Sequence, residues 1–149
     1  MRKSMVVFIA LAVLVMGGAA WAATTTVAVS ASVVGTCQFN NVGSVPFGQL
    51  NQVNAPLVTG VVVQPTFWCT KNSNYTITHN AGASPVMTGA TAGNTDTIPY
   101  NFSLGTALGT GAGKSTPITM NIAASINAGT YSDVSADTYS QTVTLTITP

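Results

Sequence analysis

Residues 139–148 read YSQTVTLTIT, a regular alternation of apolar and polar side chains. Val143, Leu145 and Ile147 fall on one side of this segment, and the threonines between them fall on the other. Successive side chains of a β-strand point to opposite faces, so a period of two is typical of a strand with one face on a core. We therefore predict a terminal strand over 139–148, with Val143, Leu145 and Ile147 facing inward.

Short segments of the same kind recur toward the N-terminus. Strands are expected over residues 24–34, 37–39, 45–50, 57–69, 75–79, 98–104 and 117–126. Pro65 interrupts the fourth of these, which should bulge or lie at an edge there. The Gly-, Asn-, Ser- and Pro-rich stretches 80–97 and 105–116 are expected to be loops. Many short strands without helical periodicity predict an all-β, immunoglobulin-like β-sandwich with Greek-key connections.

The N-terminus has the pattern of an export signal. Arg2 and Lys3 precede an unbroken apolar run from Met5 to Met16, and Ala20-Trp21-Ala22 ends the stretch. A basic start, an apolar centre and an A-x-A ending predict a signal peptide over residues 1–22, removed after Ala22. The alternative is an uncleaved membrane anchor, since the uncharged stretch is almost long enough to span a bilayer. The rest, 23–149, is expected to form a single domain.

Charge is scarce in this chain. Hydrophobic residues make up 46% of it, enough for a core, but only 5% of the residues are charged. After the leader, two lysines (Lys71, Lys114) stand against three aspartates (Asp96, Asp133, Asp137). No basic patch is available for nucleic acid. A neutral surface of Thr, Ser, Asn and Gln offers little repulsion between copies, so it suits a chain that packs against itself.

The two cysteines, Cys37 and Cys69, both follow the leader. In an oxidising compartment, an even pair predicts a disulfide. A metal or redox site is the rival interpretation. The spacing argues against it, because there is no C-x-x-C motif and His79 is the single histidine.

Residues for catalysis are sparse. A Ser-His-Asp triad would have to be built on His79, and nothing in the spacing of the aspartates supports one. The stretch 109–115 (GTGAGKS) resembles a phosphate-binding loop, but that motif needs a glycine where Leu108 stands. We therefore expect no enzyme activity, no cofactor, no metal and no small-molecule substrate.

Several short motifs occur in a familiar order. They are Gly35-Thr36-Cys37, Pro46-Phe47-Gly48-Gln49-Leu50, Phe67-Trp68-Cys69-Thr70 with Tyr75-Thr76-Ile77, Pro99-Tyr100-Asn101-Phe102-Ser103-Leu104, Ala128-Gly129-Thr130-Tyr131-Ser132-Asp133 and the closing Thr/Val strand. The set resembles the spore coat protein U domain family, whose best understood members look like the pilins of archaic chaperone–usher pili. Two departures leave the register of the last strand open. Residues 134–138 intervene, so that Tyr131 or Tyr139 is the equivalent tyrosine, and the chain ends on Pro149.

The resemblance implies an incomplete, pilin-type sandwich that lacks its final strand. It implies a structural subunit of a pilus or surface filament, with roles in adhesion and biofilm, exported through the periplasm to the cell surface. A periplasmic chaperone would fill the open groove first. At an outer-membrane usher, the N-terminal strand of another copy or a related pilin would then replace it.

Two parts of the sequence fit these roles. Residues 23–34 fit the donor strand, with Val27, Val29, Ala31 and Val33 on its inserting face, although this strand could also pair within its own domain. Val143, Leu145 and Ile147 fit the groove and the chaperone-contacting strand. The alternative function is a secreted, monomeric coat or matrix-binding module.

Overall fold

A computed structural model describes residues 22–149 of the chain. The chain divides into one unit that ends at Ser32 and a second unit over Val33–Pro149. The predicted signal peptide lies outside the described residues except for Ala22, and its cleavage stays a prediction. In the described part of the first unit, residues 22–32 are exposed and carry no strand.

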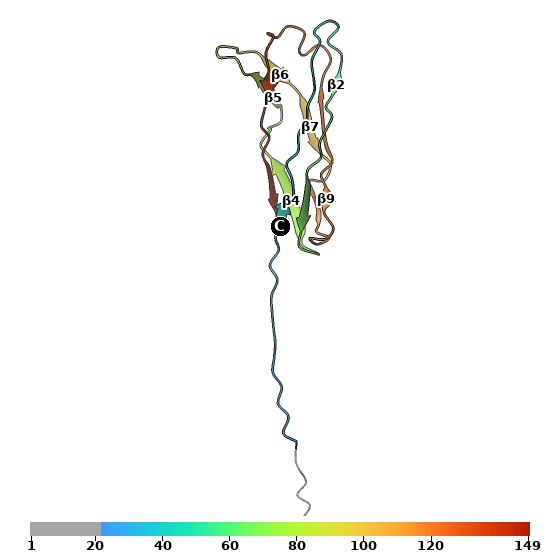
Figure 1. Ribbon diagram of the computed structural model, residues 1–149, viewed down its shortest axis with the longest axis vertical. Helices are drawn as coiled ribbons and strands as arrows, with labels where there is room; N and C mark the ends of the chain where they lie inside the picture. The colour runs from blue at the N-terminus through green and yellow to red at the C-terminus, as the bar shows by residue number, and fades with distance from the viewer. Residues whose placement is uncertain (1–21) are drawn as a thin grey trace, which may run out of the picture. The chain divides into compact units, whose positions relative to one another are not determined.

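The second unit is built from two layers of antiparallel strands (Figure 1). The first layer contains β1 (Cys37–Phe39), β2 (Val58–Thr59), β3 (Thr66–Cys69), β7 (Asn101–Leu104), β9 (Ile118–Thr119) and β10 (Ile122–Ile126). Its strands are ordered β1-β3-β9 and β2-β10-β7. Because residues 58–69 and 118–126 each contribute to both groups, the two groups form one continuous layer.

The second layer contains the remaining strands. They are β4 (Asn74–His79), β5 (Val86–Gly89), β6 (Thr97–Pro99), β8 (Leu108–Thr110), β11 (Tyr139–Ser140) and β12 (Leu145–Thr148). Their order is β12-β4-β8 and β11-β5-β6. The strand predicted over 139–148 is thus formed only at its two ends, as β11 and β12, and residues 141–144 between them carry none. Both parts of this last strand lie at an edge. The fold is thus the all-β, immunoglobulin-like sandwich that the alternation predicts.

Two expected loops contain strands. β5 lies within 80–97 and β8 within 105–116. In β5 only Met87 is buried, which leaves too little alternation to stand out among turn residues. In β8, Gly109 packs against Tyr75, and a Cβ at this position would lie 2.7 Å from the tyrosine hydroxyl. Gly109 is therefore a strand residue in close contact with its neighbour, although its sequence context is typical of a loop.

Two expected strands are not formed in this chain. Residues 45–50 carry none, because Pro46 cannot donate a backbone hydrogen bond and Gly48 has φ of 74°. This part of the chain is joined to residues 61–63 by two contacts. They are the bridge between Ser44 and Val63 and a hydrogen bond from the Val61 amide to the Pro46 carbonyl. The half-buried strand expected over 24–34 is also absent. All of these residues are exposed, so their alternation is not matched by burial within the chain.

Pro65 does interrupt its strand, as the sequence predicts. β2 and β3 stand on either side of it, and the side chain of Gln64 substitutes for the missing backbone pairing. The Gln64 amide donates to the Ile122 carbonyl at 2.8 Å and accepts from the Ile122 N–H at 2.8 Å. The layer therefore stays connected across the proline.

The space between the layers holds two groups of buried side chains. One contains Ala55, Met87, Ile98, Tyr100, Ala124, Ile126 and Tyr131. The other contains Phe67, Cys69, Tyr75, Ile77, Met120 and Ile122. Val45 and Phe102 are half-buried and pack against both, so they join the two groups into one core.

Tyr131 is buried in this core, whereas Tyr139 only packs against it. Tyr131 is 1% exposed and its hydroxyl donates to the Pro56 carbonyl at 2.8 Å. It follows Gly129, whose φ of 79° makes the turn that brings the ring inward. Tyr139 is half-buried at the start of β11. Of the two candidate tyrosines, Tyr131 is therefore the one that anchors the turn before the last strand.

Cys37 and Cys69 form the predicted disulfide. The two residues are direct partners in the β1–β3 register, with their Cα atoms 4.1 Å apart. The bond closes a loop with a sequence separation of 32. It ties β1, an edge strand, to β3 inside the layer.

We expect loss of this disulfide to destabilise the domain strongly. A loop of this length corresponds to about 4 kcal/mol in the chain-entropy treatment of cross-links. Denaturant unfolding of the purified protein, with and without reductant, measures the effect. The variant with both Cys37→Ala and Cys69→Ala should match the reduced protein, and equal stability of all three forms would contradict this assignment.

Candidate functional site

The last strand of the chain has a hydrogen-bonded partner on one side. β12 pairs with β4, and β11 pairs with β5. Between them, the Asn80 amide donates to the Thr144 carbonyl at 3.2 Å, which continues the same side. In the part of the chain that the structure describes, the other side has no backbone partner, since β11 and β12 are edge strands.

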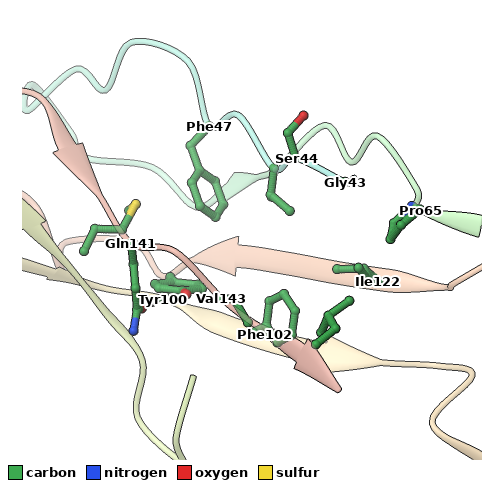
Figure 2. Close-up of a pocket in the computed structure, with 12 residues that line it drawn as sticks. Gly43, Ser44, Phe47, Pro65, Tyr100, Phe102, Ile122, Gln141 and Val143 are labelled. Atoms are coloured by element: carbon green, nitrogen blue, oxygen red, sulfur yellow. Dashed lines mark hydrogen bonds between the residues drawn. The ribbon is translucent and has the colours of Figure 1, made fainter. Parts of the chain in front are cut away.

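The opposite layer also presents an edge to this gap. Residues 43–47 pair with 60–63 on one side only, through Ser44 and Pro46. A groove runs between this segment and the last strand (Figure 2). Figure 2 shows Phe47 on one wall and Phe102, Gln141 and Val143 on the other. Two unpaired strand edges thus face each other across one depression.

The groove is lined mainly by core side chains. Its residues are Gly43, Ser44, Val45, Phe47, Pro65, Met87, Tyr100, Phe102, Ile122, Gln141, Val143 and Leu145. Val45 and Phe102, which join the two halves of the core, are among them. The groove therefore exposes the middle of the core, where a further strand would cover it.

The three predicted groove residues share one side of the terminal segment, with Leu145 and Ile147 in β12 and Val143 just before it. Val143, Leu145 and Ile147 are half-buried, and the threonines between them are exposed. Val143 and Leu145 line the groove. Ile147 packs beyond it, against the buried group around Phe67. That these residues contact a chaperone or a donor strand stays a prediction.

One polar contact sits in the apolar lining. The hydroxyl of Tyr100 donates to Oε1 of Gln141 at 2.8 Å. Tyr100 is 9% exposed, and burial raises the pKa of its phenol. Sequence reasoning missed this pair because the two residues are 41 positions apart. The clue in the sequence is that a polar residue, Gln141, stands where the alternation of the segment places an inward-facing side chain.

The groove continues toward the end of the sandwich where β5 and β6 lie in Figure 1. Val45, Phe47 and Met87 are shared by both parts. Beyond them, the walls are residues 45–53 on one side and 134–139 on the other, with Ile98 and Tyr131 among the lining side chains.

A carboxylate network fixes the wall formed by residues 134–139. Asp137 accepts hydrogen bonds from Asn94 Nδ2 at 2.7 Å and from the Thr91 amide at 2.9 Å. The Asn94 side-chain hydrogen bond, followed by backbone donors, lowers the pKa of Asp137 to about 2. The Ser135 hydroxyl and amide likewise lower the pKa of Asp96. These bonds hold the loop after β5 against the last strand.

The predicted donor residues belong to the first unit and the junction after it. Val27, Val29 and Val33 are 80%, 91% and 85% exposed, and Ala31 is also exposed. Such exposure of alternating valines leaves apolar surface available for another partner. Their role as an inserting face stays a prediction.

The residues considered for catalysis have structural contacts. His79 ends β4, accepts a hydrogen bond from the Ala81 amide through Nδ1 at 3.2 Å, and packs edge-to-face on Phe102. Lys114, in the glycine-rich stretch, lies over the Trp68 ring.

Within residues 22–149, no group of three or more His, Cys, Asp or Glu side chains is positioned to hold a metal. Over the same residues, the structure has no helix with the length and hydropathy needed to cross a membrane.

The fold and the groove define a class of protein. It is an immunoglobulin-like domain with one disulfide and with two unpaired edges that face each other across a groove. The sequence model of the spore coat protein U domain family matches residues 23–146, and the chain belongs to this family. It is a family of structural, pilin-like domains associated with pilus- or fimbrial-type surface subunits. No curated protein matches the chain.

We expect the folded domain to lose stability at acidic pH in part because Asp137 becomes protonated. Its pKa is depressed to about 2 in the folded protein, from an ordinary value of 3.8. Its contribution is therefore complete above about pH 4 and is lost as the pH falls toward about 2. Across this pH range, the melting temperature of the natural protein should fall more steeply with decreasing pH than that of Asp137→Asn. Asp133→Asn removes a carboxylate without these hydrogen bonds and should leave the slope unchanged. Equal slopes for all three proteins would contradict the prediction.

Proposed function

We propose that this protein is a structural subunit of a chaperone–usher type pilus or surface filament, polymerised by donor-strand exchange. The observation that carries the proposal is the groove between residues 43–47 and the last strand, where core side chains lie beside two unpaired edges. Family membership places the chain among pilus-type domains and supports the same function.

An open groove of this kind favours an extended peptide as its occupant. Unpaired N–H and C=O groups along both walls can bond a strand laid between them, and alternate side chains of that strand can fill the apolar floor. Left empty, the same edges are a template for uncontrolled aggregation. A subunit with such a groove therefore needs a partner from the time it folds.

The N-terminal arm has the properties of that partner. Val27, Val29, Ala31 and Val33 alternate with Ala28, Ser30 and Ser32, and the segment carries no charge. One face is apolar and the other is small or polar, which matches a strand laid over a core. Inserted into the groove of another copy, the arm makes a contact that does not close on itself, and repetition of the contact gives a filament.

The order of partners is the one that the resemblance to chaperone–usher pilins implies. The signal peptide over residues 1–22 directs export, and a periplasmic chaperone covers the groove of the new subunit. At an outer-membrane usher, the arm of another copy, or of a related pilin, replaces the chaperone strand. The end product is a surface filament with adhesive and biofilm roles, and no catalytic step is involved.

Removal of the arm should separate polymerisation from chaperone binding. A protein lacking residues 23–34 keeps the groove and loses the donor, so it should bind the chaperone and add no further subunit through its own arm. The measurement is the ladder of oligomers that survives mild heating in detergent. A soluble, stable monomer formed by this variant without a chaperone would contradict the proposal and favour a monomeric coat or matrix-binding module.

The face of the arm can be tested with a matched pair of substitutions. Val29→Asp places a charge in the core of the neighbour and should abolish polymerisation, since a buried unpaired charge is very costly. Ser30→Asp lies on the opposite face and should polymerise normally. Surface filaments are counted for both. Equal polymerisation, or a stronger defect in Ser30→Asp, would show that the assigned face is wrong.

A further inference from the structure

Gln141 is an exposed polar residue between β11 and β12, at a position that shares the parity of the inward-facing residues around it. Tyr139, Gln141, Val143, Leu145 and Ile147 alternate along this segment, and Gln141 lines the groove with its Oε1 held by Tyr100. Within residues 22–149, the Nε2 of Gln141 has no hydrogen-bond partner. An apolar strand laid over the groove would cover this amide.

Covering the amide restricts what can lie opposite it. A buried N–H without an acceptor is costly, so the covering strand must leave Nε2 room to reach a backbone carbonyl. A valine directly across from Gln141 would fill that space with methyl groups. A residue with only a Cβ leaves it free. On the inserting face of the arm, Ala31 is the one residue of this size between Val27 and Val33.

We propose that Gln141, held by Tyr100, sets the register of the inserted arm by accepting Ala31 as its direct neighbour. The inference rests on the proposed donor-strand function and adds to it the residue that selects the alignment. Like the single polar residue of a coiled-coil seam, Gln141 makes alternative alignments unfavourable by leaving a polar group unsatisfied in them.

The direction of the arm follows from where its subunit begins. The amide of Thr36 donates to Thr70 Oγ1 at 3.0 Å, and Cys37 is bonded to Cys69, so the folded body starts immediately after the arm. With Ala31 across from Gln141, a parallel arm would bring Gly35 and Cys37 alongside Leu145 and Ile147, inside the groove. The donor's body would collide with the walls. An antiparallel arm instead leaves the groove at the Tyr139 end.

The antiparallel alignment defines each pair. Facing the core, Val33 lies across from Tyr139, Ala31 from Gln141, Val29 from Val143, and Val27 from Leu145. Facing away from it, Ser32 lies across from Ser140 and Ser30 from Thr142. At the opposite end, a Cβ on Gly35 would lie 3.5 Å from that of Pro149, so the walls converge there and the alignment is confined to residues 27–33.

Cysteine pairs on the outward face test this alignment directly, because these positions do not disturb the core. Directly opposite residues have the Cα separation that a disulfide needs, and a shift of two residues exceeds it. The full-length variant with Ser30→Cys and Thr142→Cys should form reducible links between consecutive subunits. The matched variants with Ser32→Cys or Ala28→Cys, each combined with Thr142→Cys, report a two-residue slip in either direction and should not link.

The outcomes separate the two proposals. Links in the Ser30/Thr142 variant alone support the alignment. If ladders form but cysteine links appear only in one of the matched variants, the proposed register is wrong and donor-strand exchange still holds. A link formed within a monomer shows insertion into the chain's own groove and overturns both proposals, as does a natural protein that forms no ladder.

The role of Gln141 as a positioning residue has its own readout. Gln141→Leu removes the amide and should still polymerise, but slipped links should rise by at least about fivefold relative to the aligned link, the factor for an unsatisfied amide. Gln141→Asn, the conservative variant, should restore part of the preference. An unchanged ratio in Gln141→Leu would show that the amide does not select the register.

Discussion

The structure depends on one constraint: the last strand is hydrogen-bonded to β4 and β5 and has no backbone partner on its other side within the described residues. A sandwich with an edge here cannot close over its core. Val45 and Phe102 pack against both halves of that core, and they also line the groove. The exposed region is therefore the joint between the two halves, so a strand that occupies it would complete the fold.

Several local devices keep the domain folded around this opening. The Gln64 side chain bonds Ile122 twice where Pro65 interrupts the strand pairing, and Tyr131 ties its turn to Pro56. Asp137 binds the loop after β5, which fixes one wall of the groove. Each device satisfies polar groups that strand pairing leaves free, as buried or edge backbone requires. These contacts hold the walls of the groove in the isolated chain.

The alternation of residues 139–148 predicted the inward face of the terminal segment, although the structure divides the predicted strand into β11 and β12 with no strand over 141–144. An even pair of cysteines after the predicted leader was sufficient to predict the disulfide. The prediction was wrong where the chain departs from regular alternation. β5 and β8 lie in stretches rich in Gly, Asn, Ser and Pro, which predict loops, although Gly109 is required by its contact with Tyr75. Residues 45–50 have apolar side chains typical of a strand, but Pro46 and the positive φ of Gly48 prevent one from forming. The pairing of Tyr100 with Gln141 depends on tertiary contact, and no local pattern predicts it.

The position of the disulfide has a mechanical consequence. In a filament joined through its arms, pulling force would enter each subunit at Val33–Thr36 and reach Cys37 next. β1 is an edge strand, and an edge strand loaded from one end can peel away one hydrogen bond at a time. Here the first residue of β1 is covalently joined to Cys69 of β3, whose other neighbour is β9. Tension would therefore pass across the layer at once, and rupture would require shearing several strands together, which resists load far better than unzipping one.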